Sequence, residues 1–71
     1  MKLTVDIASV PDRDEVVGEI WLGDDMVAEV SKAALGGYSI ELYPSPSGAA
    51  WRLDLKDLVD VLEMAKKRLA K

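Results

Sequence analysis

Three stretches of this chain alternate between apolar and other side chains, and only short segments separate them. They cover residues 16–22, 26–32 and 38–43, and residues 2–10 alternate in the same way. Because successive side chains of a β-strand point to opposite faces, this alternation predicts four half-buried strands. Connections this short suit hairpins between antiparallel strands. The chain is therefore expected to form an antiparallel meander, with its first turn at residues 11–14.

The alternation also assigns each strand residue to a face of the expected sheet. One face takes the apolar set Val16, Ile20, Leu22, Met26, Ala28, Val30, Tyr38, Ile40 and Leu42. The other takes Val17, Glu19, Trp21, Val27, Glu29, Glu41 and Tyr43. Loops of three residues at 23–25 and five at 33–37 keep the faces consistent, whereas a two-residue loop at 24–25 would mix them. These registers predict two rows across the second face, Glu19–Glu29–Glu41 and Trp21–Val27–Tyr43. One allowed register of the first strand adds Asp6 beside Glu19 and Thr4 beside Trp21.

Residues 55–70 carry a helical pattern. Asp54 suits the N-cap, and Asp57 stands three residues later, where a capping box has its second member. An apolar stripe follows at helical spacing, and three bases occupy the last turn, where the helix dipole favours cations. The fold class is then α+β, a four-stranded antiparallel meander with one C-terminal helix packed on one face, in a single domain of residues 1–71. Residues 51–53 could add a short fifth edge strand, and Trp51 is expected in the core.

The chain contains neither cysteine nor histidine. Thiolate chemistry, the usual zinc sites and Ser–His–Asp catalysis are therefore excluded. Calcium and magnesium need oxygen ligands that converge on one point, and acid–base work by two carboxylates needs an enclosed pocket. One sheet with one helix offers little room for either, so we expect no enzyme activity, no metal and no cofactor. The lack of cysteine and of any apolar run long enough to span a membrane favours a cytoplasmic protein.

Charge is distributed unevenly along the chain. Residues 1–30 hold eight acids and two bases, a net charge of −6, while residues 31–71 hold five acids and seven bases, a net charge of +2. A nucleic-acid-binding domain usually has a basic patch and a high pI, whereas the pI here is about 4.6. The basic cluster at residues 66–68 is better explained by the helix dipole than by phosphate binding. Direct binding of nucleic acid is therefore not expected.

A row of glutamates across adjacent strands is not what stability favours, because like charges directly opposite one another repel. The second face therefore becomes the candidate binding surface, with aromatic side chains that are favoured at protein interfaces. Its candidate site residues are Glu19, Trp21, Val27, Glu29, Glu41 and Tyr43. The partner is expected to be a basic protein or a second copy of the chain in a homodimer. A third reading is that Trp21 only covers Val27 and Tyr43 as a cross-strand cluster.

Segments between Gly18 and Leu69 resemble small acidic bacterial proteins of the immunity or inhibitor type, which neutralise a toxin by covering it. The resemblance is carried by EIW, AEV, IELYP and a tryptophan before a helix that begins with LDL. It implies a non-enzymatic, stoichiometric binder whose acidic surface covers the basic active site of a toxin or nucleic-acid enzyme. The alternative is a small homodimeric scaffold or accessory domain whose second sheet face is only an oligomer interface. The element order is also similar to single-strand DNA-binding coactivator folds, but those need bases on the face that carries carboxylates here.

Overall fold

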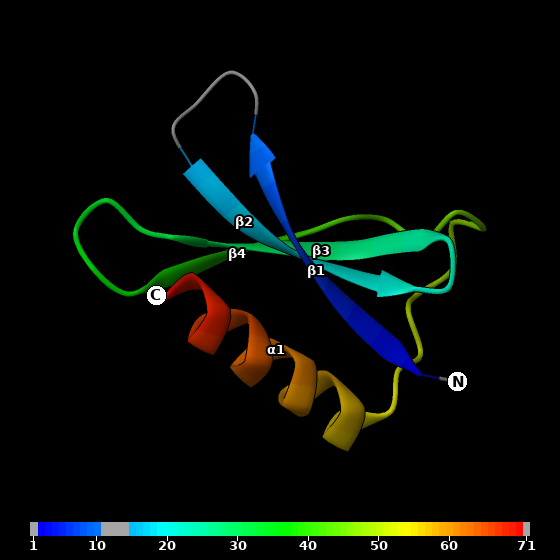
Figure 1. Cartoon of the computed structure of the whole chain (residues 1–71). Helices are drawn as coiled ribbons and strands as arrows, with labels where there is room; N and C mark the ends of the chain where they lie inside the picture. The colour runs from blue at the N-terminus through cyan, green and yellow to red at the C-terminus, as the bar shows by residue number, and fades with distance from the viewer. Residues whose placement is uncertain (1, 11–14, 71) are drawn as a thin grey trace.

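The computed structural model describes residues 2–10 and 15–70, without the side chain of Val10. Strands β1 (Leu3–Val10), β2 (Glu15–Leu22), β3 (Asp25–Lys32) and β4 (Tyr38–Leu42) precede one helix, α1 (Leu55–Leu69). The strands form one antiparallel sheet in the order β1-β2-β3-β4, and α1 lies on one of its faces (Figure 1). The predicted fold class is confirmed. The turn predicted at residues 11–14 lies outside the described residues, and residues 51–53 form no fifth strand.

Most of the predicted register is confirmed. Glu19 pairs with Glu29, and Glu29 pairs with Glu41 on the next strand. The five-residue connection at 33–37 is present as predicted, with Lys32 opposite Tyr38. Strand β1 adopts the register that was left open, with Asp6 opposite Glu19 and Thr4 opposite Trp21.

The β2–β3 hairpin departs from the prediction at its tip. The loop has two residues, Gly23 and Asp24, because Leu22 pairs with Asp25 and Trp21 pairs with Met26. Gly23 has a φ of 63°, a left-handed conformation that tight hairpin turns require. The register shifts between Ile20 and Trp21, so β3 contains one extra residue there, a β-bulge at Val27. The predicted pairing of Trp21 with Val27 is therefore wrong.

The bulge also changes the face to which Val27 belongs. Val27 is 2% exposed and belongs to the buried core cluster, with Ile20 and Ala28 of the helix-covered face. A bulge places two residues of one strand opposite one residue of the other, which breaks the simple alternation. The sequence-based assignment of Val27 to the other face is therefore wrong. In the described part of the chain, the core cluster consists of Leu3, Val5, Ile20, Val27, Ala28, Val30, Val61, Ala65 and Leu69, with Leu22, Trp51, Leu53, Leu58 and Leu62 packed around it.

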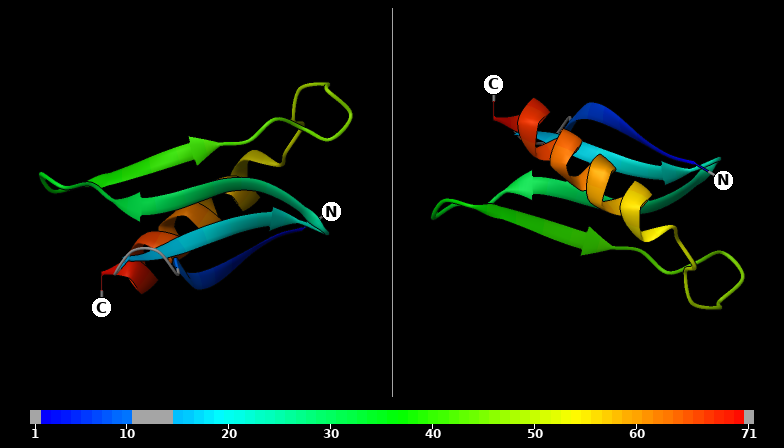
Figure 2. Two further views of the ribbon diagram at one scale, coloured as in Figure 1. Left: turned by 90° about the horizontal axis from the view of Figure 1, so that it is seen from above. Right: turned by 90° about the horizontal axis from the view of Figure 1, so that it is seen from below.

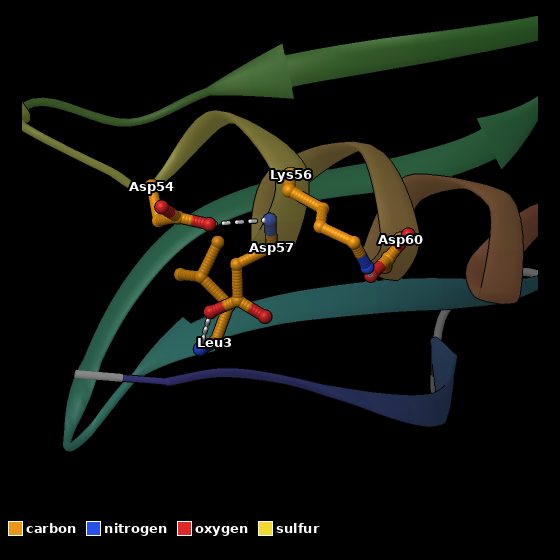
Figure 3. Close-up of polar contacts among 5 residues, drawn as sticks. All are labelled: Leu3, Asp54, Lys56, Asp57 and Asp60. Carbon is orange, nitrogen blue, oxygen red and sulfur yellow. Dashed lines mark hydrogen bonds and ion pairs between the residues drawn. The ribbon is translucent and has the colours of Figure 1, made fainter.

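Helix α1 begins as predicted but one expected bond is replaced by another. Asp54 is the N-cap, and its Oδ2 accepts the backbone N–H of Asp57 at 2.9 Å. In a capping box, the Asp57 carboxylate would accept a hydrogen bond from the backbone N–H of Asp54. Instead, Asp57 Oδ2 accepts the backbone N–H of Leu3 at 2.7 Å, which ties α1 to β1 (Figure 3). Near the other end of α1, the Arg68 guanidinium donates to the backbone oxygen of Val5 at 3.4 Å.

Helix α1 packs on β1, β2 and β3 and leaves much of β4 uncovered (Figure 2). Close packing over β2 depends on Gly18, where an added Cβ would come within 3.0 Å of the Ala65 Cβ. The apolar side chains of β4 lie on the helix side as predicted, but the helix covers them only in part. Tyr38 contacts α1, since its hydroxyl donates to the backbone oxygen of Lys66 at 3.5 Å and the Lys66 Nζ lies 5.4 Å from its ring centre. Tyr38, Ile40 and Leu42 are 38%, 46% and 69% exposed; we call them the β4 apolar row. Val16, also assigned to the core face, is exposed as well.

Trp51 was predicted to reach the core, and it packs against the core cluster. Its indole N–H donates to the backbone oxygen of Tyr43 at 2.8 Å. This bond holds the segment before α1 against the end of β4. It also fixes the backbone of Tyr43, whose side chain belongs to the candidate site described below.

Candidate functional site on the open sheet face

The face of the sheet turned away from α1, here called the open face, carries a carboxylate on every strand. Asp6, Glu19, Glu29 and Glu41 are direct cross-strand partners from β1 to β4 and form what we call the acidic row. Direct neighbours on one face of an antiparallel pair have Cβ atoms about 5 Å apart. Four like charges at this spacing repel one another, so the row costs stability that the rest of the fold must supply.

Aromatic hydroxyl and indole groups contact the acidic row directly. The Tyr43 hydroxyl donates to Oε1 of Glu29 at 2.5 Å and lies 3.4 Å from Oε1 of Glu41. The indole N–H of Trp21 donates to Oε1 of Glu19 at 3.2 Å. Trp21, Tyr43, Glu19 and Glu29 are all half-buried, whereas Glu41 is exposed. These bonds hold two carboxylates of the row in fixed positions.

The carboxylates around the Tyr43 hydroxyl raise its pKa. The hydrogen bond to Glu29, assisted by loss of solvent and by the nearby negative charges of Glu29 and Glu41, raises the pKa of Tyr43 from 10.0 to about 12. Both effects of the carboxylates act in the same direction, because an anionic phenolate would face anionic neighbours and lose its donor hydrogen. Tyr43 therefore remains a neutral hydrogen-bond donor at all physiological pH values.

A hollow lies on the open face between β2 and β4. Its wall includes carboxylates and hydroxyl groups, and Val17, which is only 4% exposed, also lines it. The residues that line the hollow are Glu15, Val17, Glu29, Ser31, Ser39, Ile40 and Glu41. Such a hollow suits a lysine or arginine side chain. These side chains have an apolar stem, which can be buried, and a charged end, which a carboxylate can bind.

The structure brings five of the six predicted site residues to the open face and separates the sixth. Glu19, Trp21, Glu29, Glu41 and Tyr43 share this face through the pairings and hydrogen bonds given above. Val27 does not belong to it, because its side chain lies in the core. The two remaining members of the predicted Trp21–Val27–Tyr43 row are therefore not joined by a central valine. Tyr43 still adjoins β3 through its backbone N–H, which donates to the Val27 oxygen at 2.9 Å.

Glu15, Ser31 and Ser39 were not predicted as site residues. Each stands an even number of positions from a glutamate of the row on the same strand, so side-chain alternation alone could have identified them. Asp6 was identified only as one allowed register of β1. The length of the turn between β1 and β2 was ambiguous, so the sequence did not decide between the possible registers of β1.

Among residues 2–10 and 15–70, no group of three or more acidic side chains is arranged to hold a metal ion. In the same residues, the helix is too short and too polar to cross a bilayer. Comparison of the chain with protein-family models, curated proteins and solved structures finds no match.

Proposed function

We propose that this chain is a non-enzymatic, acidic protein-binding domain of the immunity or inhibitor type. It covers a basic surface of a partner protein with its open face. Toxins and nucleic-acid enzymes are suitable partners, because the grooves that hold their nucleic-acid substrates are basic. A cytoplasmic location is part of the proposal, since a small domain without cysteine suits a reducing compartment.

The acidic row carries this proposal. Its four carboxylates oppose one another across all three strand pairs, an arrangement that sheet stability disfavours. A basic partner would convert this repulsion into attraction, since lysines and arginines would enter between the carboxylates. The free energy stored as repulsion in the isolated domain would then be released on binding.

The hollow and the two aromatic side chains support the same proposal. One lysine or arginine of the partner would place its stem over Val17 and its charged end between Glu29 and Glu41. Trp21 and Tyr43 would supply apolar contact beside the charges, as aromatic residues do at binding hot spots. Complementary charge would speed association and select basic partners, while the aromatic contacts would slow dissociation.

Affinity capture with matched charge variants tests the proposal. One bait is the triple variant Glu19→Gln, Glu29→Gln, Glu41→Gln. Its control is Asp24→Asn, Asp25→Asn, Glu63→Gln, which removes the same net charge from exposed positions outside the acidic row. Wild type and control should retain one basic protein that the first variant loses, and added salt should release it. A partner that all three baits retain equally would contradict the proposal.

The second test is inhibition. The captured protein, purified alone, should lose its activity when one equivalent of wild-type chain is added and keep it with the triple glutamine variant. Binding without inhibition would support a protein-binding domain and would contradict the proposal that it is an inhibitor.

The alternative function, a homodimeric scaffold that uses the open face only to self-associate, would bring two acidic rows together. Like-charge repulsion opposes this arrangement, which is why we favour the basic partner. Light scattering on wild type and Trp21→Glu separates the two. A variant that becomes a folded monomer and still binds the partner would assign the face to dimerisation.

A further inference from the structure

We propose that the chain forms a two-fold symmetric dimer through the edge of β4, in which two β4 strands pair antiparallel with Ile40 opposite its own copy. This interface runs along the strand edge and goes beyond the proposed function, and it borders the open face at Ser39 and Glu41. The two sheets would join into one sheet of eight strands.

The two edge strands differ in whether side chains bond to their outer backbone. This difference makes β4 the edge that is available for pairing with another strand. Strand β1 is one edge, and α1 satisfies its backbone on that side with Asp57 at the Leu3 N–H and Arg68 at the Val5 oxygen. Each edge strand carries one carboxylate, Asp6 on β1 and Glu41 on β4, so the contacts to the backbone are what distinguish the two edges. Natural proteins protect edge strands by such devices against pairing with other chains. In the described residues, no side chain is bonded to the outer backbone of β4 in the same way.

The hydrogen-bonding pattern shows which β4 residues face outward. The N–H of Ala33 donates to the Gly37 oxygen at 3.1 Å, and the N–H of Tyr43 donates to the Val27 oxygen. Backbone bonding in an antiparallel strand alternates from residue to residue. The odd-numbered residues of β4 therefore bond to β3, and the backbones of Tyr38, Ile40 and Leu42 point to the open edge. These are the residues of the β4 apolar row.

A two-fold axis at Ile40 makes this edge complementary to itself. Tyr38 would pair with Leu42 of the second copy, and Ile40 with Ile40. Each pair exchanges two backbone bonds, about six in total. The three apolar side chains, 38% to 69% exposed in the single chain, would each gain an apolar cross-strand neighbour on the helix side of the sheet. Gly37 and Pro44 limit the pairing at its two ends.

The charges on β4 favour the register with the two-fold axis at Ile40 over the neighbouring registers. On the open face, Ser39 would stand opposite Glu41 of the second copy, so a hydroxyl donor would meet a carboxylate. An axis at Glu41 would place two glutamates opposite each other, which is unfavourable. An axis at Ser39 would leave Leu42 without a partner in β4. Pairing at Ile40 is therefore the register that uses the whole strand without opposing like charges.

Disulfide trapping tests both the interface and its register, because the chain has no cysteine of its own. Ser39→Cys and Glu41→Cys are prepared as separate chains, both at exposed positions. Mixed and oxidised, they should give a cross-linked dimer in several-fold higher yield than either chain alone. Equal yields, or cross-linking of Ser39→Cys mainly with itself, would overturn the register.

Sedimentation tests the interface without any engineered bond. Wild type should reach twice the chain mass of 7.7 kDa as concentration rises. Ile40→Lys should be a monomer, because it opposes two cations at the axis, whereas Leu55→Lys, on the exposed side of α1, should remain dimeric. Circular dichroism of Ile40→Lys should show the helix content of wild type. A wild type that stays monomeric at NMR concentrations would overturn the proposal, as would loss of dimer in Leu55→Lys alone.

Discussion

The backbone N–H of Leu3 donates to the carboxylate of Asp57 at 2.7 Å, across 54 positions of the chain. The bond joins the edge strand β1 to the first turn of α1 (Figure 3). It satisfies a backbone donor that would otherwise face the open edge of the sheet. One carboxylate thus fixes the position of the helix start and closes one edge to other strands.

Asp57→Ala should lower the free energy of unfolding by about 1–2 kcal/mol, because a hydrogen bond to a charged group is lost and the Leu3 donor is left half-buried. Asp60→Ala is the matched control. It removes an exposed carboxylate whose partner is Lys56 at 3.0 Å, a pair worth about 0.5 kcal/mol or less. Urea denaturation of both variants gives the comparison. Equal losses would show that the bond to Leu3 adds nothing to stability.

Replacing one end of the acidic row by a cation should stabilise the domain. Asp6→Lys places a positive charge opposite Glu19, and the expected gain is about 0.2–1 kcal/mol. Asp24→Lys is the control, because it makes the same change of net charge at an exposed position of the β2–β3 loop, outside the acidic row. Thermal unfolding at low and high salt should show a gain for Asp6→Lys that salt reduces. Equal gains from both variants would attribute the effect to overall charge.

The bond between Tyr43 and Glu29 predicts a loss of stability in alkali. The folded chain raises the pKa of Tyr43 to about 12, against 10.0 for the unfolded reference. Stabilisation by the protonated hydroxyl is therefore complete below pH 10 and is lost as the pH rises towards 12. Glu29→Gln should move the phenolate titration of Tyr43 down towards pH 10.

Ultraviolet absorbance measures that titration, in a Tyr38→Phe background because the chain has two tyrosines. Glu63→Gln on α1 serves as the control and should leave the titration unchanged. A Tyr43 titration that is the same in Glu29→Gln and in the parent chain would contradict the bond.

Val27→Ala tests the core position that the β-bulge creates. The substitution removes apolar carbon from a side chain that is 2% exposed, so a loss of about 1–3 kcal/mol is expected. Val16→Ala, at a side chain that is 48% exposed, should cost much less. Chemical denaturation distinguishes them. If both variants lost a similarly small free energy of unfolding, the placement of the Val27 side chain in the core would be contradicted.

The regular part of the fold could be predicted from the sequence because alternation and helical spacing are local signals. The pairing of Glu29 with Glu41 followed from the five-residue loop, which kept apolar residues on one face. The pairing of Glu19 with Glu29 was also predicted correctly, although the loop has two residues and not three, because the extra residue of the bulge compensates for the shorter loop. The bulge could not be predicted in this way. A bulged strand has the same composition as a regular one, and whether Val27 turns inward depends on the packing of the whole core.

The exposure of β4 was not predictable for a related reason. Its apolar alternation is as clear as that of β2, and a sequence pattern does not say how far across a sheet one helix reaches. A helix is about 10 Å wide, and strands are about 4.8 Å apart, so one helix covers two or three strands. Which strand is left over depends on contacts such as those of Asp57 and Arg68 with β1, which join residues far apart in the sequence.

Gly18 contributes to this placement of the helix. Because it has no side chain, Ala65 approaches the β2 backbone closely, and α1 is held over the β1 side of the sheet. A side chain at this position would act as a wedge that lifts the helix or displaces it sideways. The size of the residue at this one position of β2 therefore helps to set how far the helix reaches across the sheet towards β4.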